Sequence, residues 1–273
     1  MRYRVIALDL DGTLLTAKKT ILPESLLALN KAREAGVKVI LVTGRHHVAI
    51  HPFYQTLALN TPAICCNGSY SYDYQTKGVL QADPLSLSQT LQVIDVLKQT
   101  SIHGLLYVDD AMLYTEETGH ITRALQWEQT LPQHQRPTLN RVNSLEQGAR
   151  EAKSIWKFAL AHPERDELHT FIAQIESKFG LACEWSWIDQ VDIAQTGNSK
   201  GKRLAQWVES QGYTMNDVVA FGDNYNDISM LERAGLGVAM GNADEAVKQR
   251  ADIVISNNEE PGIAQLIEER ILH

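Results

Sequence analysis

Short apolar runs and longer amphipathic stretches alternate near both ends of the chain. Residues 5–8, 37–42 and 218–221 are almost entirely apolar, which is typical of strands buried on both faces of a parallel sheet. Residues 22–36, between the first two runs, repeat Leu and Ala at helical spacing and end in Gly36. A strand, a helix and a parallel strand in this order form a right-handed crossover. The pattern therefore predicts an α/β fold with a doubly wound, Rossmann-like parallel sheet.

The same alternation continues toward the C-terminus. A helix is predicted from Lys200 and ends at Gly212, and residues 236–239 and 253–255 read as two further short strands. A last helix is expected from about Gly262. These elements complete the predicted doubly wound sheet.

The pattern changes between about residue 84 and residue 188. Helical stretches here are interleaved with pairs of short strands, which indicates an α+β domain with an antiparallel sheet. Residues 132–150, rich in Pro, Gln, Asn and Arg, are expected to form a loop. We expect residues 1–83 and 189–273 to form one core, with residues 84–188 inserted as a cap domain, because a loop of a parallel sheet tolerates insertion.

Composition narrows the classes of protein that this chain can be. Of its 273 residues, 44% are hydrophobic and 21% are charged, as in an ordinary globular protein. The net charge is −8 and no run of Lys or Arg stands out, so no nucleic-acid partner is expected. The apolar runs are too short to span a bilayer, and the N-terminus leads directly into the first strand. We expect a cytoplasmic protein with no membrane contact, and no obligate protein partner is evident.

Two carboxylates follow the first predicted strand. Asp9 and Asp11 lie where the chain leaves the sheet, and Gly12 suits a sharp turn there. A buried carboxylate is costly unless another group compensates its charge. A divalent cation held by oxygen ligands is the simplest compensation. The crevice beyond the carboxyl ends of the strands is also where open α/β sheets bind ligands.

Polar groups follow two other predicted strands and begin one helix. Thr43 and Gly44 end the second strand, and the segment Gly222-Asp-Asn-Tyr-Asn-Asp227 ends a later one. Ser199 is the expected N-cap of the helix that starts with Lys200. A cation in the first turn opposes the helix macrodipole, so Lys200 makes sense where it faces an anion. The carboxyl ends of parallel strands meet at one edge, so these groups are expected to converge.

The four motifs, in this order, resemble those of the haloacid dehalogenase-like hydrolases, most of which are phosphatases. Asp9 to Thr13 is similar to the family's DxDGT, Thr43 to its second motif, Lys200 to its third, and residues 222–227 to its GDxxND. The resemblance covers the whole chain and is closest to the Cof-type branch. It implies that the core is catalytic and that the inserted domain sets substrate specificity.

The resemblance also implies roles for individual residues. Asp9 would be the nucleophile that takes the phosphoryl group, and Asp11 the general acid and base. Mg²⁺ would be bound by Asp9, Asp223 and the backbone carbonyl of Asp11, with Asp227 orienting these ligands. The residues expected to contact the phosphate are Leu10, Thr43, Gly44, Lys200 and Asn226.

A small phosphorylated metabolite is the expected substrate. The resemblance to Cof-type phosphatases favours pyridoxal 5′-phosphate, with sugar phosphates such as erythrose 4-phosphate as side substrates. A phosphotransferase or phosphomutase shares the same first step, and a non-catalytic binding protein could keep the same fold. Trp185 and Trp187 could stack on a pyridine ring or form part of the core of the inserted sheet. Asn67, before a glycine, could lie near the substrate or belong to a plain turn.

Overall fold

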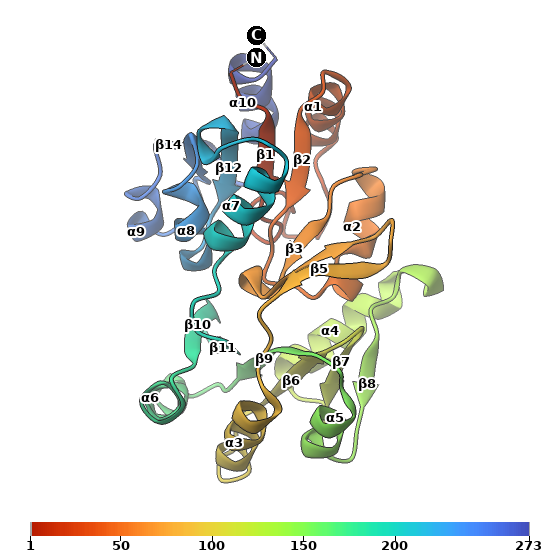
Figure 1. The fold of residues 1–273 in the computed structure, drawn as a ribbon, viewed down its shortest axis with the longest axis vertical. Helices are drawn as coiled ribbons and strands as arrows, with labels where there is room; N and C mark the ends of the chain where they lie inside the picture. Colours follow the sequence, from red (N-terminus) through yellow and green to blue (C-terminus); the bar gives the residue numbers. More distant parts are fainter. Residues whose placement is uncertain (1, 273) are drawn as a thin grey trace. The chain divides into compact units, whose positions relative to one another are not determined.

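The structure is a computed structural model in which residues 2–272 are described (Figure 1). The chain forms two compact units. The first unit consists of the described residues up to Gly44, of Phe53–Gln81 and of the described residues from Ser199 onward. The second unit consists of Arg45–Pro52 and Ala82–Asn198. Each unit has its own sheet and its own hydrophobic core.

A five-stranded parallel sheet organises the first unit. Its strand order is β14-β13-β12-β1-β2, and the strands are β1 (Val5–Leu8), β2 (Lys38–Leu41), β12 (Val218–Gly222), β13 (Leu236–Ala239) and β14 (Ile253–Val254). Leu8 pairs with both Leu41 and Phe221, so β12, β1 and β2 end at the same edge of the sheet. The order and the parallel pairing confirm the predicted α/β fold.

Helices cover the sheet on both faces. Val5, Ala7 and Ala220 belong to a core cluster that also includes residues of α7 (Lys200–Ser210) and α8 (Ile228–Leu231). Neighbouring strand residues point to the opposite face. There α1 (Pro23–Glu34) and α10 (Gly262–Arg270) pack against each other (Figure 1). The arrangement is the doubly wound one that the sequence predicts.

Shorter elements complete the first unit. A three-stranded sheet has the order β3-β4-β5, and Val42 and Ile64 form an isolated parallel bridge that places β3 beside the chain that leaves β2. The strands β4 and β5 form a hairpin that starts at residue 70. The remaining elements are β3 (Ala63–Cys65), β4 (Tyr70–Asp73), β5 (Gly78–Ala82), α2 (His51–Thr56), α9 (Glu245–Lys248) and the 3-10 turns η2 (Cys66–Gly68), η4 (Met215–Asp217) and η5 (Tyr225–Asp227).

The second unit is an α+β domain, as predicted. Its sheet has the order β10-β11-β9-β6-β7-β8, in which the β7–β8 pair alone is parallel among the described pairs. The strands are β6 (His103–Val108), β7 (Ala111–Tyr114), β8 (Leu139–Arg141), β9 (Ile155–Ala161), β10 (Ala182–Trp187) and β11 (Gln190–Ala194). The helical elements are η1 (His47–Ala49), α3 (Leu87–Leu97), α4 (Gly119–Thr130), η3 (Gln133–Gln135), α5 (Leu145–Glu151) and α6 (Arg165–Phe179).

The prediction that residues 132–150 form a loop is wrong in part. The segment contains the edge strand β8 and most of α5, whose N-cap Ser144 accepts a hydrogen bond from the amide of Gln147. Neither element is long enough for its hydrophobic periodicity to be recognised in the sequence. The strand has three residues, and Ala149 is the buried residue of the helix.

The predicted boundaries of the insertion also differ from the structure. Residues 189–198 belong to the second unit, because β11 pairs with β9 and β10 of its sheet. Residues 82–83 and Arg45–Pro52 join the same unit. The apolar alternation of a strand shows which face it buries, whereas its partner sheet depends on contacts that are distant in sequence.

Trp185 and Trp187 have different surroundings, although regular alternation along β10 would place them on one face. The register of the β10–β11 pair shifts between these residues, and such a bulge interrupts the alternation of side chains. Trp185 packs against the core of the second unit, and its ring centroid lies 4.9 Å from that of His169. Trp187 is 67% exposed.

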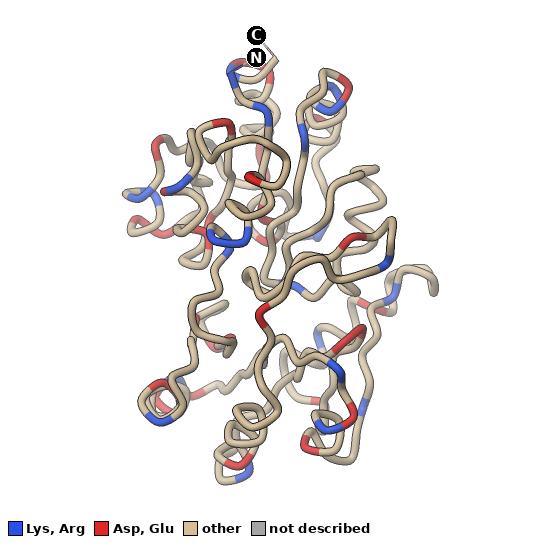
Figure 2. The backbone as a smooth tube through the Cα atoms, in the orientation of Figure 1, with Lys and Arg blue, Asp and Glu red and all other residues tan. Residues whose placement is uncertain are grey.

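Charged residues of both signs are spread over both units. Lys and Arg are interspersed with Asp and Glu along the backbone tube in each of them (Figure 2). Of the helices within residues 2–272, none combines the length and the apolar composition that crossing a bilayer requires.

Candidate active site

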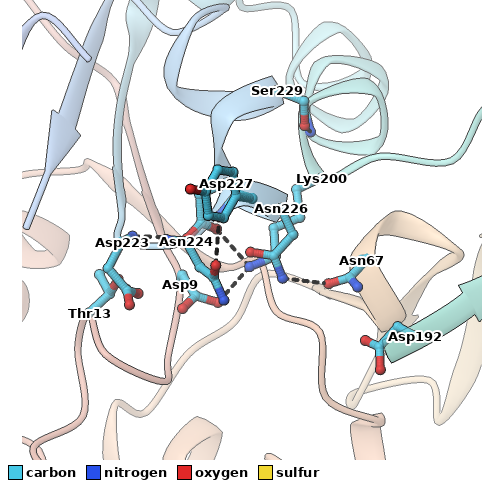
Figure 3. Close-up of polar contacts among 12 residues, drawn as sticks. Asp9, Thr13, Asn67, Asp192, Lys200, Asp223, Asn224, Asn226, Asp227 and Ser229 are labelled. Atoms are coloured by element: carbon cyan, nitrogen blue, oxygen red, sulfur yellow. Dashed lines mark hydrogen bonds and ion pairs between the residues drawn. The ribbon is translucent and has the colours of Figure 1, made fainter. Parts of the chain in front are cut away.

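The carboxyl ends of β1 and β12 bring a set of aspartates together. Asp9 directly follows β1, and its amide extends the sheet by donating to the Phe221 carbonyl at 3.1 Å. Asp223 follows β12 in the adjacent position. Asp9, Asp223 and Asp227 each offer a carboxylate oxygen, and these three atoms lie within 4.8 Å of one another (Figure 3).

Lys200 links two of these carboxylates. Its Nζ donates to Asp9 Oδ1 and to Asp227 Oδ1, both at 2.7 Å, and its side chain is 1% exposed (Figure 3). The Ser199 hydroxyl accepts a hydrogen bond from the Lys202 amide and caps α7, which positions Lys200 in the first turn. Burial lowers the pKa of Lys200, but the carboxylates of Asp227 and Asp9 outweigh this effect and raise the pKa overall. The ammonium therefore stays charged.

Asp227 shapes the turn that bears Asp223. One of its oxygens accepts from the amides of Asp223 and Asn224, at 2.9 and 3.0 Å, and the other accepts from Lys200. The side chain is fully buried. A Cβ on Gly222 would lie 2.5 Å from the Cβ of Asp227, so only glycine allows this close approach. With both oxygens engaged, Asp227 holds the turn in place.

The turn after β1 packs directly against Asp223. Thr13 donates from its hydroxyl to Asp223 Oδ1 at 2.7 Å. Gly12 has a φ of +81°, and a Cβ at this residue would lie 2.1 Å from Asp223 Oδ2. Thr13 is absent from the predicted site residues, although it lies in the segment that pointed to Asp9. A hydroxyl two residues beyond a candidate metal ligand is the signal that could have suggested it.

Burial and mutual repulsion make the charged forms of Asp9 and Asp223 unfavourable. Burial raises the pKa of Asp9 well above its ordinary value, with Lys200 opposing and Asp227 and Asp223 adding to the shift. Burial and the Asp227 carboxylate raise the pKa of Asp223 to about 7. A divalent cation would remove this repulsion, and hard cations such as Mg²⁺ select carboxylate and carbonyl oxygens. The residues present therefore fit a Mg²⁺ site.

Asp11 and Leu10 lie in the same turn but outside the carboxylate cluster. The Asp11 side chain is 38% exposed and accepts from Lys19 Nζ at 2.6 Å. Leu10 buries its side chain, and its carbonyl accepts from the amides of Thr13 and Leu15. Leu10 can therefore contact a ligand only through its backbone.

The remaining predicted phosphate contacts surround Asn67. Thr43 is buried and accepts at its carbonyl from the Asn67 amide at 3.1 Å. A Cβ on Gly44 would lie 2.8 Å from Asn67 Oδ1, and the same oxygen accepts from Asn226 Nδ2 at 3.0 Å. Asn67 adopts a left-handed conformation with a φ of 55°, which Asn tolerates better than most residues. Asn67 is thus both a turn residue and a neighbour of the predicted phosphate contacts (Figure 3).

The fold and the site define a doubly wound α/β protein with an acidic, lysine-bridged centre at the carboxyl ends of its strands. Residues 6–267 match the family model of the haloacid dehalogenase-like hydrolases. The chain therefore belongs to the haloacid dehalogenase-like hydrolase family, which confirms the resemblance seen in its motifs.

Relatives and solved structures are similar over nearly the full length. The chain is 63% identical over 267 residues to the pyridoxal phosphate phosphatase YbhA of Escherichia coli K12, covering 98% of each protein. It is 29% identical to the 5-amino-6-(5-phospho-D-ribitylamino)uracil phosphatase YitU of Bacillus subtilis, covering 97% of this chain and 96% of that protein. A crystal structure of a haloacid dehalogenase-like hydrolase from Bacteroides thetaiotaomicron superposes with a TM-score of 0.85 at 25% identity, covering 98% and 99% of the two chains.

Proposed function

We propose that this protein hydrolyses phosphate monoesters of small metabolites and that pyridoxal 5′-phosphate is its preferred substrate. The observation that supports the chemistry best is the contact of Lys200 with both Asp9 and Asp227, beside Asp223. The substrate is supported by the 63% identity to a pyridoxal phosphate phosphatase. Sugar phosphates such as erythrose 4-phosphate are proposed as side substrates.

Asp9, Asp223 and the backbone carbonyl of Asp11 would hold Mg²⁺. When bound, the ion supplies positive charge that draws a phosphate group toward carboxylates that would otherwise repel it. Asp227 is not proposed as a direct ligand, because Lys200 and two backbone amides already occupy its oxygens. Its proposed task is to orient Asp223.

Asp9 is the proposed nucleophile. Lys200 holds one of its oxygens, which leaves the other to attack the phosphorus. This step forms an aspartyl-phosphate and breaks the bond between phosphorus and the ester oxygen. Lys200, Thr43, Asn226 and the backbone amides of Leu10 and Gly44 would stabilise the charge on the phosphoryl oxygens.

Asp11 is the proposed general acid and base. It lies two residues from Asp9 and its side chain is partly exposed, so it can exchange its Lys19 contact for the substrate. It protonates the departing alkoxide and then accepts a proton from the water that cleaves the aspartyl-phosphate. Inorganic phosphate leaves and Asp9 is regenerated. Such acid–base catalysis typically contributes about 10²–10⁴ in rate.

Phosphate release from pyridoxal 5′-phosphate in the presence of Mg²⁺ tests the proposal. The Asp9→Asn variant should fold but lose activity by more than about 10³-fold, because a neutral amide is a poor nucleophile. Near-normal turnover by this variant would disprove the covalent step. An arm with an added acceptor alcohol separates hydrolysis from phosphotransfer. If the added alcohol, and not water, takes the phosphoryl group, the protein is a phosphotransferase.

A further inference from the structure

Two asparagines of the first unit contact the turn that follows Asp9. Asn242 donates from Nδ2 to the Gly12 carbonyl at 2.9 Å. Asn258 donates from Nδ2 to the Leu15 carbonyl at 2.7 Å. We call these two residues the asparagine pair. Through them the turn is held at two of its carbonyls.

The members of the asparagine pair are bonded to each other. The backbone amide of Asn258 donates to Asn242 Oδ1 at 3.1 Å. Asn242 therefore uses its amide oxygen on its partner and its amide nitrogen on the turn. A carboxylate in its place would have no proton to donate to the Gly12 carbonyl, and an aliphatic side chain would make neither contact. The position thus requires an amide side chain.

The asparagine pair comes from the ends of two neighbouring strands. One member follows β13 and the other follows β14, and these strands pair in parallel. The Gly241 amide donates to the Ser256 carbonyl at 3.1 Å, so the segments that carry the pair are themselves bonded together. Glu259 adds a third contact, because its Oε1 accepts from the Ala17 amide at 2.6 Å. These three contacts join residues that are 230 to 243 positions apart in the sequence.

The turn that the pair contacts contains a glycine and carries two functional groups. Gly12 has a φ of +81°, and glycine restricts its own backbone less than any other residue. Asp11 precedes it, and Thr13, whose hydroxyl donates to Asp223, follows it. The Asp11 side chain contacts Lys19 and has to exchange this contact for the substrate during catalysis. A backbone held by the pair allows that exchange by rotation of the side chain alone, without displacing Thr13.

The contacts of the asparagine pair assign it a role in catalysis without a contact to the substrate. We propose that Asn242 and Asn258 are positioning residues, which hold the backbone of the turn so that the Asp11 carboxyl reaches the leaving oxygen and the attacking water. The inference rests on the proposed function and extends it to two residues outside the four motifs. A reacting group that is misplaced by about 1 Å can cost about 10²-fold in rate. The groups that bind the phosphate would stay in place, so substrate affinity should be retained.

Two variants each remove one contact between the pair and the turn. Asn242→Leu and Asn258→Leu replace the amide by an apolar group of similar size, at positions that are exposed and half-buried. Asn257→Leu is the matched control, because this asparagine lies in the same segment but its side chain bonds to Glu259 and Glu260. The assay compares two esters. Pyridoxal 5′-phosphate releases an alkoxide that needs a proton, whereas 4-nitrophenyl phosphate releases a stable anion.

Each variant should lose about 10- to 100-fold in kcat for pyridoxal 5′-phosphate, while KM changes by less than about threefold. Release of 4-nitrophenolate in the first turnover, measured by rapid mixing, should keep its rate within about threefold, because this leaving group needs no general acid. The control should behave like the unmodified protein with both esters. A loss of equal size in the control, or a first release of 4-nitrophenolate slowed as much as turnover of pyridoxal 5′-phosphate, would overturn the inference, as would unchanged kcat.

Hydrogen–deuterium exchange of the full-length proteins tests the asparagine pair independently of catalysis. Backbone amides of residues 12–17 should exchange about 2- to 10-fold faster in both variants, as expected for the loss of one hydrogen bond, and at an unchanged rate in the control. Should the unmodified protein release phosphate from neither ester, the proposed function fails, and this measurement still decides whether the pair holds the turn. Faster exchange confined to the turn supports the inference, and unchanged exchange refutes it.

Discussion

At the scale of single residues, the site depends on two glycines and one lysine. Gly12 and Gly222 let Asp223 and Asp227 approach the backbone more closely than any side chain would allow. Lys200 offsets part of the repulsion among the three clustered carboxylates. The motif residues thus contact one another directly, with Lys200 Nζ 2.7 Å from an oxygen of Asp9 and 2.7 Å from an oxygen of Asp227.

Gly12→Ala should abolish activity and destabilise the protein, because the new Cβ would lie 2.1 Å from Asp223 Oδ2. Gly36→Ala is a matched control, since its φ of +88° is similar but no atom lies within 4 Å of a Cβ there. Denaturant unfolding should show a loss of about 1 kcal/mol for Gly36→Ala, from backbone strain alone, and a larger loss for Gly12→Ala. Equal losses, with activity retained in both, would contradict the packing argument.

At the scale of elements, α7 holds the turn that bears Asn67. Arg203 of this helix donates from Nε to the Gly68 carbonyl at 3.0 Å, and its side chain is 3% exposed. A Cβ on Gly68 would lie 2.3 Å from the Ser199 carbonyl oxygen, so η2 packs directly against the start of α7. One helix therefore positions both Lys200 and the turn that contacts Asn226.

Arg203→Met should loosen this turn while keeping the packing of the aliphatic part of the side chain. We expect a loss of about 1.5–3 kcal/mol in the free energy of unfolding, the range for a buried hydrogen bond from a charged group. KM for phosphate esters should rise while the fold persists. Urea titration and steady-state kinetics check both effects, and Arg250→Met, at an exposed ion pair with Glu232, serves as the control. A variant with unchanged KM would show that α7 does not position the turn.

At the scale of the whole molecule, the carboxylate cluster couples stability to pH and to metal binding. The pKa of Asp223 is about 7 in the folded protein, against an ordinary value of 3.8. The folded state therefore binds more protons than the unfolded state between these values. By linkage, the free energy of unfolding falls as the pH rises through this window. Asp9 shifts in the same direction.

Without Mg²⁺, stability should decrease between about pH 4 and pH 7, by at most about 1.4 kcal/mol per pH unit from the Asp223 carboxyl. Adding Mg²⁺ should reverse the trend near pH 7, because the ion binds the deprotonated carboxylates and stabilises the folded state. Thermal unfolding over this pH range, with chelator and with Mg²⁺, measures both slopes. Asp223→Asn should flatten the metal-free profile, and an unaltered slope in that variant would refute the assignment.

The local sequence pattern was sufficient to predict an element wherever its apolar residues form a continuous run or a regular repeat. The apolar runs before Asp9 and Asp223 determined the buried parallel strands, because a strand covered on both faces needs apolar residues at every position. The order of the four motifs determined the family. In the helix Arg165–Phe179, the buried residues recur at helical spacing, which the sequence shows directly; they are Leu168, Phe171, Ile172 and Ile175.

Only the tertiary structure decided which groups meet across the sequence. The contact of Thr13 with Asp223 spans 210 residues, and that of Asn226 with Asn67 spans 159. The pairing of β11 with the second sheet and the burial of Lys157 beside Asp192 likewise depend on neighbours from other strands. The residue type determines which interactions a side chain can make. Its partner, its burial and therefore its charge state depend on chain segments that are distant in the sequence, and a local pattern does not show which of these segments will be neighbours.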